Sequence, residues 1–376
     1  MNATTPEPSP SAVSHRLLSL DALRGFDMFW IVGGDTFLKV LFTLIGKYTF
    51  PALRLPWPQE QFEHVDWDGF HFEDLIFPLF VFLSGVALPF SLGKRVERGE
   101  TNPMLYWRIA RRTALLILLG LIYNDGGLLT FKFAHMRYPS VLARIGLAYG
   151  FAAIIMLHAG IRGRVAWLVI LLVGYWAAMT LIPVPGFGAG RLAPGMNLAD
   201  YIDLNVLPGR THRGDGDPEG LLSTLPAIGT ALMGLLAGQW LRDGRYRPLE
   251  KTLGLFAAGG VSLALGALWD PWFPINKNLW SSSFVLWAGG WSLLLLGLFY
   301  LIIDVWGWRR WTFPLVVIGV NPITIYLASR FIDFQWIVNR VFHGAPVHRS
   351  LLHQSGILLA WLLVYLMYRN KIFWRV

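Results

Sequence analysis

The sequence lacks cysteine altogether, which excludes disulfides, thiolate metal sites and a cysteine nucleophile. It is also poor in charge, because charged residues make up 15% of its 376 residues and hydrophobic residues make up 55%. The mean hydropathy is +0.48. This balance excludes a water-soluble domain of ordinary composition and predicts that a lipid bilayer is the solvent of most of the surface.

The chain carries a formal net charge of +9 at pH 7, but its basic residues stand in short clusters between apolar runs. Such clusters are typical of cytoplasmic loops under the positive-inside rule, so nucleic-acid binding is not expected. Residues 1–15 are polar, rich in Pro and Ser, and have no basic start. They are therefore predicted to be a disordered cytoplasmic N-terminus and not a cleavable signal peptide.

Apolar stretches that cross ~30 Å of hydrocarbon need about 20 residues each, and the sequence offers about ten of them. They lie near 17–43, 71–92, 107–124, 139–158, 165–183, 221–241, 252–269, 281–304, 313–333 and 351–368. We therefore predict an all-α polytopic membrane protein with about ten transmembrane helices, in which residues 16–376 form a single domain. Four longer connections, 46–70, 126–138, 183–220 and 334–350, are predicted to form an extracytoplasmic loop cap.

The positions of lysine and arginine predict the orientation of this bundle. If ten helices are counted, the basic clusters all fall on one side of the membrane. This side is predicted to be cytoplasmic and to carry both termini, and the membrane is predicted to be the inner (plasma) membrane of the cell. The clusters comprise Lys94, Arg95, Arg98, Arg108, Arg111 and Arg112, then Arg162 and Arg164, Arg242, Arg245, Arg247 and Lys251, Arg309 and Arg310, and Arg369, Lys371 and Arg375.

The densest polar cluster precedes the second predicted helix and reads HVDWDGFHFED at 64–74. Acidic groups there could simply cap a helix, whose N-terminal dipole favours negative charge. His64, Asp66, Asp68 and His71 are suitable metal ligands but lack a diagnostic spacing, so no metal is expected. Because an imidazole exchanges protons near neutral pH, His64 is also a candidate catalytic base or nucleophile.

Charges inside predicted membrane helices are the second signal, because each costs at least a few kcal/mol unless it is paired or faces water. Asp21 and Arg24 are three residues apart and could simply pair on one helix face. Asp35 lies more than two turns further along, toward the side of His64, where a carboxylate could orient the imidazole.

Seven motifs follow one another in the order of one known protein family. They are Ser19 to Gly25, His64 to Phe82, Arg137 to Gly146, Asp217 to Gly220, Ile275 to Ser281, Gly319 to Asn321 and Lys371 to Val376. Together they make the chain resemble the heparan-α-glucosaminide N-acetyltransferase family along nearly its whole length. The chain looks like a compact bacterial homologue without the long amino-terminal lumenal extension of animal members.

The resemblance implies a transmembrane acetyltransferase. Such an enzyme transfers acetyl from cytosolic acetyl-CoA to the amine of a glucosamine-type sugar on the extracytoplasmic side. It also implies a homodimer. In that family the histidine at the position of His64 is the active-site residue, supported by an asparagine where this chain has Asp35. We expect the sugar to contact Trp67, Asp74, Arg144, Asn276, Asn278 and Asn321, although asparagines at helix ends often only cap or turn the chain. We expect the CoA phosphates to contact Lys94, Arg111 and Arg112, although these residues could also be plain topology determinants.

Two mechanisms and two other functions stay open at this point. His64 could deprotonate the acceptor amine for direct attack, or it could carry the acetyl group as an acetyl-imidazole. A secondary transporter of a small polar substrate would use the buried charges as a mid-membrane site. An O-acyltransferase acting on a cell-wall or lipid-linked glycan would share the chemistry and differ only in its acceptor.

Overall fold

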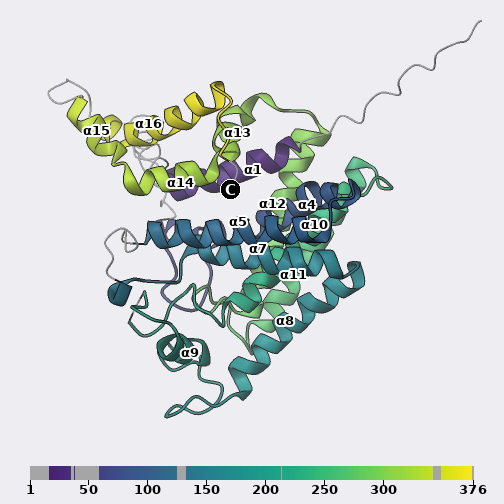
Figure 1. The fold of residues 1–376 in the computed structure, drawn as a ribbon, viewed down its shortest axis with the longest axis vertical. Helices are drawn as coiled ribbons and strands as arrows, with labels where there is room; N and C mark the ends of the chain where they lie inside the picture. The colour runs from purple at the N-terminus through teal and green to yellow at the C-terminus, as the bar shows by residue number, and fades with distance from the viewer. Residues whose placement is uncertain are drawn as a thin grey trace, which may run out of the picture.

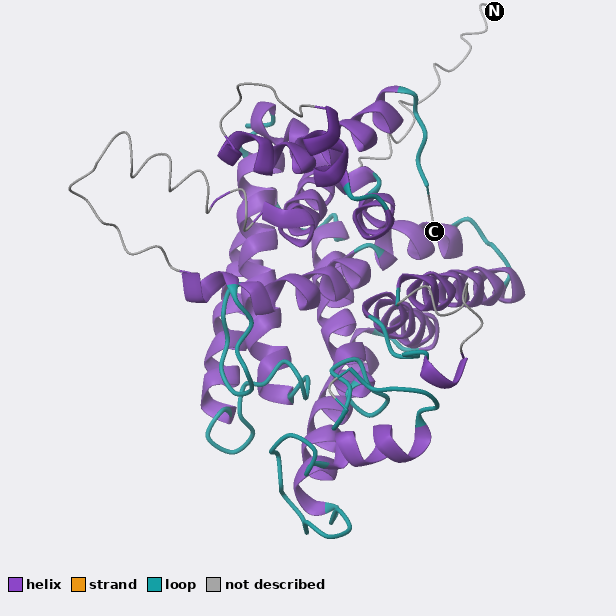
Figure 2. Ribbon diagram, turned by 90° about the vertical axis from the view of Figure 1, so that its left-hand side faces the viewer, coloured by secondary structure: helices purple, strands orange, loops and turns teal. Residues whose placement is uncertain are grey.

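A computed structural model describes residues 17–34, 38, 59–124, 133–212, 214–341 and 349–374 of the chain. Within these residues the regular structure is helical, and only two isolated β-bridges occur, between Arg137 and Gly209 and between Val184 and Gly188. Figure 2 shows helices joined by loops throughout. The predicted all-α class is confirmed.

Six helices of the described residues are long and apolar enough to cross a membrane. They are α3 (Glu73–Val86) continued by α4 (Leu88–Glu97), α7 (Val141–His158), α8 (Ile161–Leu181), α10 (Thr224–Arg242), α11 (Pro248–Trp269) and α12 (Ser282–Tyr300) continued to Val305. A seventh candidate is the pair α13 (Phe313–Val320) and α14 (Pro322–Phe331), which is bent by 67° at Asn321. The other predicted spans coincide with α1 (Leu18–Phe29), α5 (Asn102–Tyr123) and α16 (Arg349–Arg369).

Glycines allow the helices of this bundle to approach one another closely. A Cβ atom on Gly234 of α10 would lie 1.9 Å from the carbonyl oxygen of Phe82 on α3. Likewise, a Cβ atom on Gly319 of α13 would lie 1.9 Å from the carbonyl oxygen of Asp21 on α1. Small residues at such crossings are typical of membrane bundles, where helices associate by van der Waals contact. In Figure 1, α1 accordingly runs beside α13 and α14, and α5 runs beside α7.

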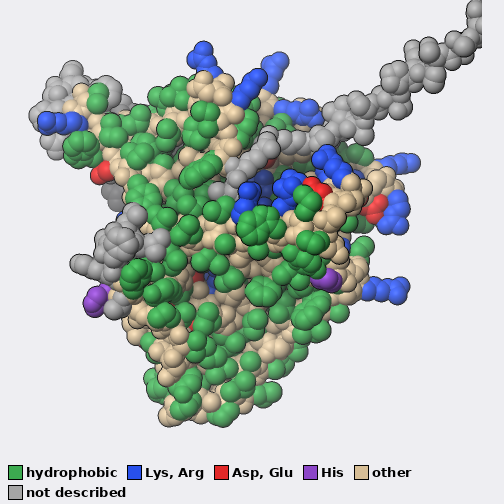
Figure 3. Space-filling view, viewed as in Figure 1, with side chains coloured by type: hydrophobic (Ala, Val, Ile, Leu, Met, Phe, Trp, Pro, Cys, Tyr) green, Lys and Arg blue, Asp and Glu red, His purple; other side chains and the backbone are tan. Residues whose placement is uncertain are grey.

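The bundle has two chemically different ends. One end, here called the loop end, carries residues 59–72, the segment 182–223 with α9 (Leu198–Val206), and residues 270–281. The opposite end, here called the basic end, carries the turn after α4 and the turn between α10 and α11, which are joined by the Arg242–Glu97 ion pair. Figure 3 shows lysine and arginine side chains gathered along the right-hand edge, where α4 and α10 lie in Figure 1, and others at the upper edge, near α13 and α16.

A buried carboxylate on α9 makes the loop end sensitive to pH. Asp203 is 1% exposed, and one of its oxygens accepts a 2.9 Å hydrogen bond from the backbone of Leu221. Its other oxygen has no hydrogen-bond partner among the residues that the structure describes. Burial raises the pKa of Asp203 from 3.8 to about 7, and the negative charge of Asp217 adds to this effect. Asp203 is therefore largely protonated in the folded protein below neutral pH.

We expect the folded protein to lose stability as the pH rises from about 4 to about 7, by about 1–3 kcal/mol after allowance for solvent screening. The reason is that Asp203 binds its proton more tightly in the folded chain than in the unfolded chain, so its contribution is complete only below the unfolded pKa. Thermal unfolding of detergent-solubilised protein across this range, compared with Asp203→Asn, measures the effect. Equal pH dependence in the two proteins would contradict it.

Candidate active site

His64, Asp74 and Lys277 meet at the loop end. Nδ1 of His64 lies 2.9 Å from Oδ1 of Asp74, and Nζ of Lys277 donates to the same oxygen over 3.1 Å. Nζ also lies 3.0 Å from Nδ1 of His64. The side chain of Asp74 is 1% exposed, that of Lys277 is 20% exposed and that of His64 is 59% exposed. An exposed imidazole thus rests on a buried carboxylate that also holds a lysine.

The start of α3 fixes the carboxylate of Asp74. Its second oxygen accepts backbone hydrogen bonds from His71 over 3.1 Å and from Val65 over 3.3 Å. Asp74 lies in the first turn of the helix, where the positive end of the helix dipole also favours an anion. The loop that carries His64 is therefore folded around Asp74 and cannot move independently of it.

A second loop brings in Lys277 from the other side. The backbone N–H of Gly69 donates to the carbonyl of Ile275 over 2.8 Å, and Asn276 donates to the carboxylate of Asp68 over 3.0 Å. Trp280 follows with a φ of 51°, which is unusual for a bulky residue, and its indole is buried and donates to Thr230. This constrained turn aims Lys277 at the imidazole.

The electrostatics of the cluster favour a histidine that accepts a proton at Nε2. Burial lowers the pKa of Lys277, and the carboxylate of Asp74 opposes this effect. In the neutral tautomer that carries its proton on Nδ1, this N–H donates to Asp74, and Nε2, 3.5 Å from Nζ of Lys277, is the acceptor nitrogen. A buried carboxylate behind an exposed imidazole is an arrangement that suits general base or nucleophilic chemistry.

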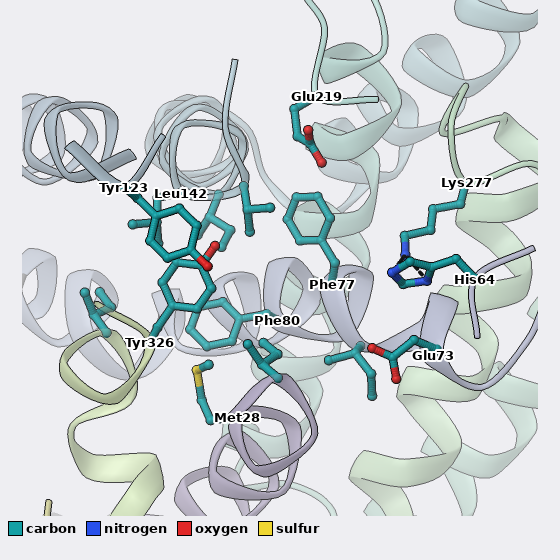
Figure 4. A pocket seen from close by; sticks show the side chains of 15 residues that line it. Met28, His64, Glu73, Phe77, Phe80, Tyr123, Leu142, Glu219, Lys277 and Tyr326 are labelled. Carbon is teal, nitrogen blue, oxygen red and sulfur yellow. Dashed lines mark hydrogen bonds between the residues drawn. The ribbon is translucent and has the colours of Figure 1, made fainter. Parts of the chain in front are cut away.

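A cavity of about 290 Å³, here called the His64 cavity, opens beside this cluster. His64, Lys277 and Glu73 line one part of it, and the stacked rings of Tyr123 and Tyr326 line another. Figure 4 shows the two tyrosines on one side, His64 and Lys277 on the other, and Phe77 and Phe80 between them. The cavity is therefore mainly apolar with polar groups concentrated around His64.

A second cavity of about 500 Å³, here called the basic cavity, opens toward the basic end. Lys94, Arg112 and Arg24 line it together with Asp21. Arg112 is stacked over the ring of Tyr149 at 4.3 Å, and its Nε is buried without a hydrogen-bond partner in the described part of the chain. Such a site suits an anion.

The two cavities share part of their walls. Phe80, Ile145 and Ile323, from α3, α7 and α14, line both of them. The His64 cavity and the basic cavity are therefore neighbours. A long molecule with an anionic head could place that head at the basic end and its other end near His64.

Some of the predicted site residues line these cavities, and others lie in contacts elsewhere in the protein. His64 belongs to the His64 cavity, Asp74 lies directly behind it, and Lys94 and Arg112 belong to the basic cavity. Arg111 is exposed on α5 and does not line either cavity. Asp35 lies outside the described residues, so its predicted support of His64 stays a prediction.

Three of the residues expected to contact a sugar form hydrogen bonds within the loop end. Trp67 donates to the carbonyl of Leu192 over 3.1 Å, and Asn278 donates to the carbonyl of Asp66 over 3.3 Å. Asn276 is buried and bonds to Asp68. None of the three lines the His64 cavity. Their predicted contact with a sugar stays a prediction, and the geometry shows that they form hydrogen bonds between loops.

Arg144 and Asn321 also bond to the protein, although Nε and Nη1 of Arg144 are buried without a hydrogen-bond partner in the described part of the chain. Arg144 is 1% exposed, donates to the carbonyl of Gly220 and to the hydroxyl of Ser223, and stacks over Trp280 at 4.9 Å. Asn321 is buried at the bend between α13 and α14. It donates to the carbonyl of Ile372 and accepts from the backbone of Trp374, so it ties down the C-terminal segment.

The sequence-based selection missed several residues that line the cavities. Lys277 stood between two selected asparagines, and Glu73 stood beside Asp74. The cavity-lining Tyr123, Tyr326 and Glu219 were also not selected. No group of three or more His, Asp or Glu residues within the described ranges could hold a metal ion.

Two known proteins are similar to this chain along nearly its whole length. A protein family described as a domain of unknown function (DUF5009) matches residues 16–191. The heparan-alpha-glucosaminide N-acetyltransferase of Homo sapiens is 30% identical over 97% of this chain, and that of Mus musculus is 29% identical over 96%. In both cases the match covers 61% of the relative's own length.

Proposed function

Because the chain belongs to the heparan-alpha-glucosaminide N-acetyltransferase family, we propose that it is a membrane N-acetyltransferase. The donor is acetyl-CoA from the cytosol, and the acceptor is the amine of a glucosamine-type sugar on the extracytoplasmic side. The chain spans about three fifths of the length of these relatives, so this activity is a proposal for the present chain.

The observation that carries the proposal is the wall that the two cavities share. CoA has a polyanionic nucleotide and a long, thin pantetheine arm that ends in the thioester. The basic cavity supplies Lys94 and Arg112 for the phosphates, and the shared wall at Phe80 leads to the cavity of His64. The basic end then faces the cytosol, as the positive-inside rule requires. The localisation in the inner membrane and the homodimer remain part of this proposal.

In the proposed reaction, Nε2 of His64 acts as the proton acceptor. The acceptor nitrogen attacks the thioester carbonyl, the carbon–sulfur bond breaks, and Nε2 takes a proton from the nitrogen. The protonated imidazole, held by Asp74, then delivers that proton to the departing thiolate to give free CoA. In the two-step alternative, Nε2 first forms a bond to the acetyl carbon and releases CoA, and the amine then takes the acetyl group.

The release of CoA thiol by purified protein tests this function. Detergent-solubilised protein is given acetyl-CoA with and without glucosamine, and free thiol and N-acetylglucosamine are measured together. We expect thiol release that depends on the amine and matches the acetylated product in amount. Binding of acetyl-CoA without any turnover, over a panel of amino sugars and hydroxyl acceptors, would contradict an acyltransferase and favour a transporter.

We expect Arg112→Ala to weaken acetyl-CoA binding by about tenfold, because a charge-assisted hydrogen bond to phosphate contributes roughly 1.5–3 kcal/mol. Arg112 is half-buried and lines the basic cavity. Its Nε is buried and has no hydrogen-bond partner in the described part of the chain. Titration of acetyl-CoA by calorimetry gives the affinity. Arg162→Ala, which removes an exposed arginine outside both cavities, is the matched control. Equal losses in the two variants would contradict a specific phosphate contact.

A further inference from the structure

Lys277 lines the His64 cavity and has no part in the proton transfers at His64. Its Nζ lies 3.1 Å from Oδ1 of Asp74 and 3.0 Å from Nδ1 of His64. It also lies 3.5 Å from Nε2, the nitrogen that takes the proton in the proposed reaction. Figure 4 shows the lysine amine next to the imidazole, at the end of the cavity away from the two tyrosines. A hydrogen-bond donor thus stands directly beside the reacting nitrogen.

The surroundings of Lys277 favour a positive charge at this position. Its side chain forms an ion pair with Asp74, whose side chain is 1% exposed. Burial lowers the pKa of Lys277, whereas the negative charges of Asp74, Glu219 and Glu73 act to raise it. A buried carboxylate favours the charged form of a lysine that it contacts, because the pair is neutral as a whole. The ammonium form is therefore the one that neutralises Asp74.

Other bonds hold both sides of the contact between Lys277 and Asp74. On the lysine loop, the backbone N–H of Ile275 donates to the carboxylate of Asp270 over 2.7 Å. The carbonyl of Ile275 accepts a 2.8 Å hydrogen bond from the loop of His64. On α3, Asp74 keeps two backbone hydrogen bonds and its contact with His64 when the lysine is absent. The fold therefore has little need of the amine of Lys277, and its position calls for a chemical explanation.

Acyl transfer develops a negative charge that the cavity has to accommodate. When the acceptor nitrogen attacks, the carbonyl double bond opens and its electron pair moves to the oxygen, which becomes an oxyanion. The acceptor nitrogen lies about 3 Å from Nε2 of His64 while Nε2 takes its proton, so the carbonyl group that it attacks is within reach of a donor 3.5 Å from Nε2. Of the described residues that line this cavity, Lys277 alone is a lysine or arginine.

From this geometry we propose that Lys277 is a further catalytic residue, whose ammonium group donates a hydrogen bond to the acetyl oxygen of the thioester as that oxygen becomes negative. This inference rests on the proposed acetyltransferase function. The lysine keeps its proton throughout. The carbon–nitrogen bond forms, Nζ holds the oxyanion, and the carbonyl group reforms as the carbon–sulfur bond breaks, while the proton from nitrogen travels through His64 to the thiolate. The same contact serves the two-step route, because each transfer to and from Nε2 also passes through an oxyanion.

Steady-state kinetics test this role. We expect Lys277→Met to lower kcat by about 10²–10³-fold, the usual effect of removing one oxyanion donor, and to leave KM for acetyl-CoA within about threefold. Lys277→Arg keeps the charge and N–H donors and is expected to recover kcat to within about tenfold of the parent value. Lys251→Met removes a partly buried lysine that lines neither cavity and is the matched control. If the parent protein transfers acetyl and Lys277→Met is as fast, the inference fails and the proposed function stands.

Infrared spectroscopy tests the contact without turnover. The probe is an isotopically labelled analogue of acetyl-CoA in which a methylene group replaces sulfur, so that no acetyl group can leave. A charge-assisted hydrogen bond weakens the carbonyl bond, so we expect a lower carbonyl frequency on the parent protein than in water or on Lys277→Met. Equal frequencies on the two proteins would overturn the inference. If the variant does not fold, a frequency on the parent protein that is no lower than in water would overturn it as well.

The two measurements together separate the inference from the proposed function. If the parent protein binds the analogue but transfers no acetyl, the proposed function fails, and the carbonyl frequency still decides whether Lys277 polarises the acetyl group. If the parent protein neither binds the analogue nor transfers acetyl, the proposed function fails and the inference fails with it.

Discussion

His64→Ala is expected to lower the rate of acetyl transfer by about 10²–10⁴-fold, which is the usual contribution of a positioned general base. The imidazole lines the His64 cavity and is 59% exposed, so its removal takes away Nε2 with little loss of packing. Acetyl-CoA affinity is expected to stay within about twofold, because the residues proposed to bind the phosphates, Lys94 and Arg112, belong to the other cavity. Product formation and acetyl-CoA titration of the same preparation measure both quantities.

A second histidine in the same loop provides the control for this experiment. His71 donates through Nδ1 to the carbonyl of Glu63 over 2.8 Å and does not line the His64 cavity. His71→Ala is therefore expected to keep the transfer rate within about threefold of the parent rate. A His64→Ala protein that folds, binds acetyl-CoA and still transfers acetyl at nearly the parent rate would exclude His64 as base and as nucleophile.

The helices could largely be predicted because each is an apolar run long enough to cross a bilayer. The run at 71–92 corresponds to α3 and α4, and the run at 221–241 corresponds to α10. The bend at Asn321 was not predicted, although Pro322 signals it, since the residue before a proline avoids the helical region. Hydropathy reports burial in lipid and carries no information about such a break.

The site was predicted only where its residues are close in sequence. His64 and Asp74 lie within one dense polar segment, but Lys277 is 213 residues away from His64 and joins it through the contact of two loops. Asp74 was expected to contact the sugar, which stays a prediction, and the structure adds that its Oδ1 lies 2.9 Å from Nδ1 of His64. Arg144 shows the opposite problem, because an intramembrane charge suggests function by default, whereas this one holds the backbone of Gly220.

Arg137→Ala is expected to destabilise the folded protein by about 3–5 kcal/mol, the usual cost of leaving a buried charge without its partner. The guanidinium makes two hydrogen bonds to Asp217, of 2.7 Å and 2.6 Å, and also pairs with Glu219. Its side chain is 14% exposed, and that of Asp217 is 0% exposed. Burial alone would raise the pKa of Asp217, but Arg137 outweighs it and lowers the pKa, so Asp217 is a true anion at neutral pH.

An exposed pair of the same chemistry separates burial from charge. Arg245 makes equally short hydrogen bonds to Asp243, but its side chain is 78% exposed, so Arg245→Ala is expected to cost far less stability than Arg137→Ala. Thermal unfolding in detergent compares the two variants. Because Arg137 also holds Glu219 at the wall of the His64 cavity, Arg137→Ala is expected to impair acetyl transfer even in the protein that remains folded. Equal stability losses for the two variants would show that the Arg137 cluster is open to water and does not hold this wall.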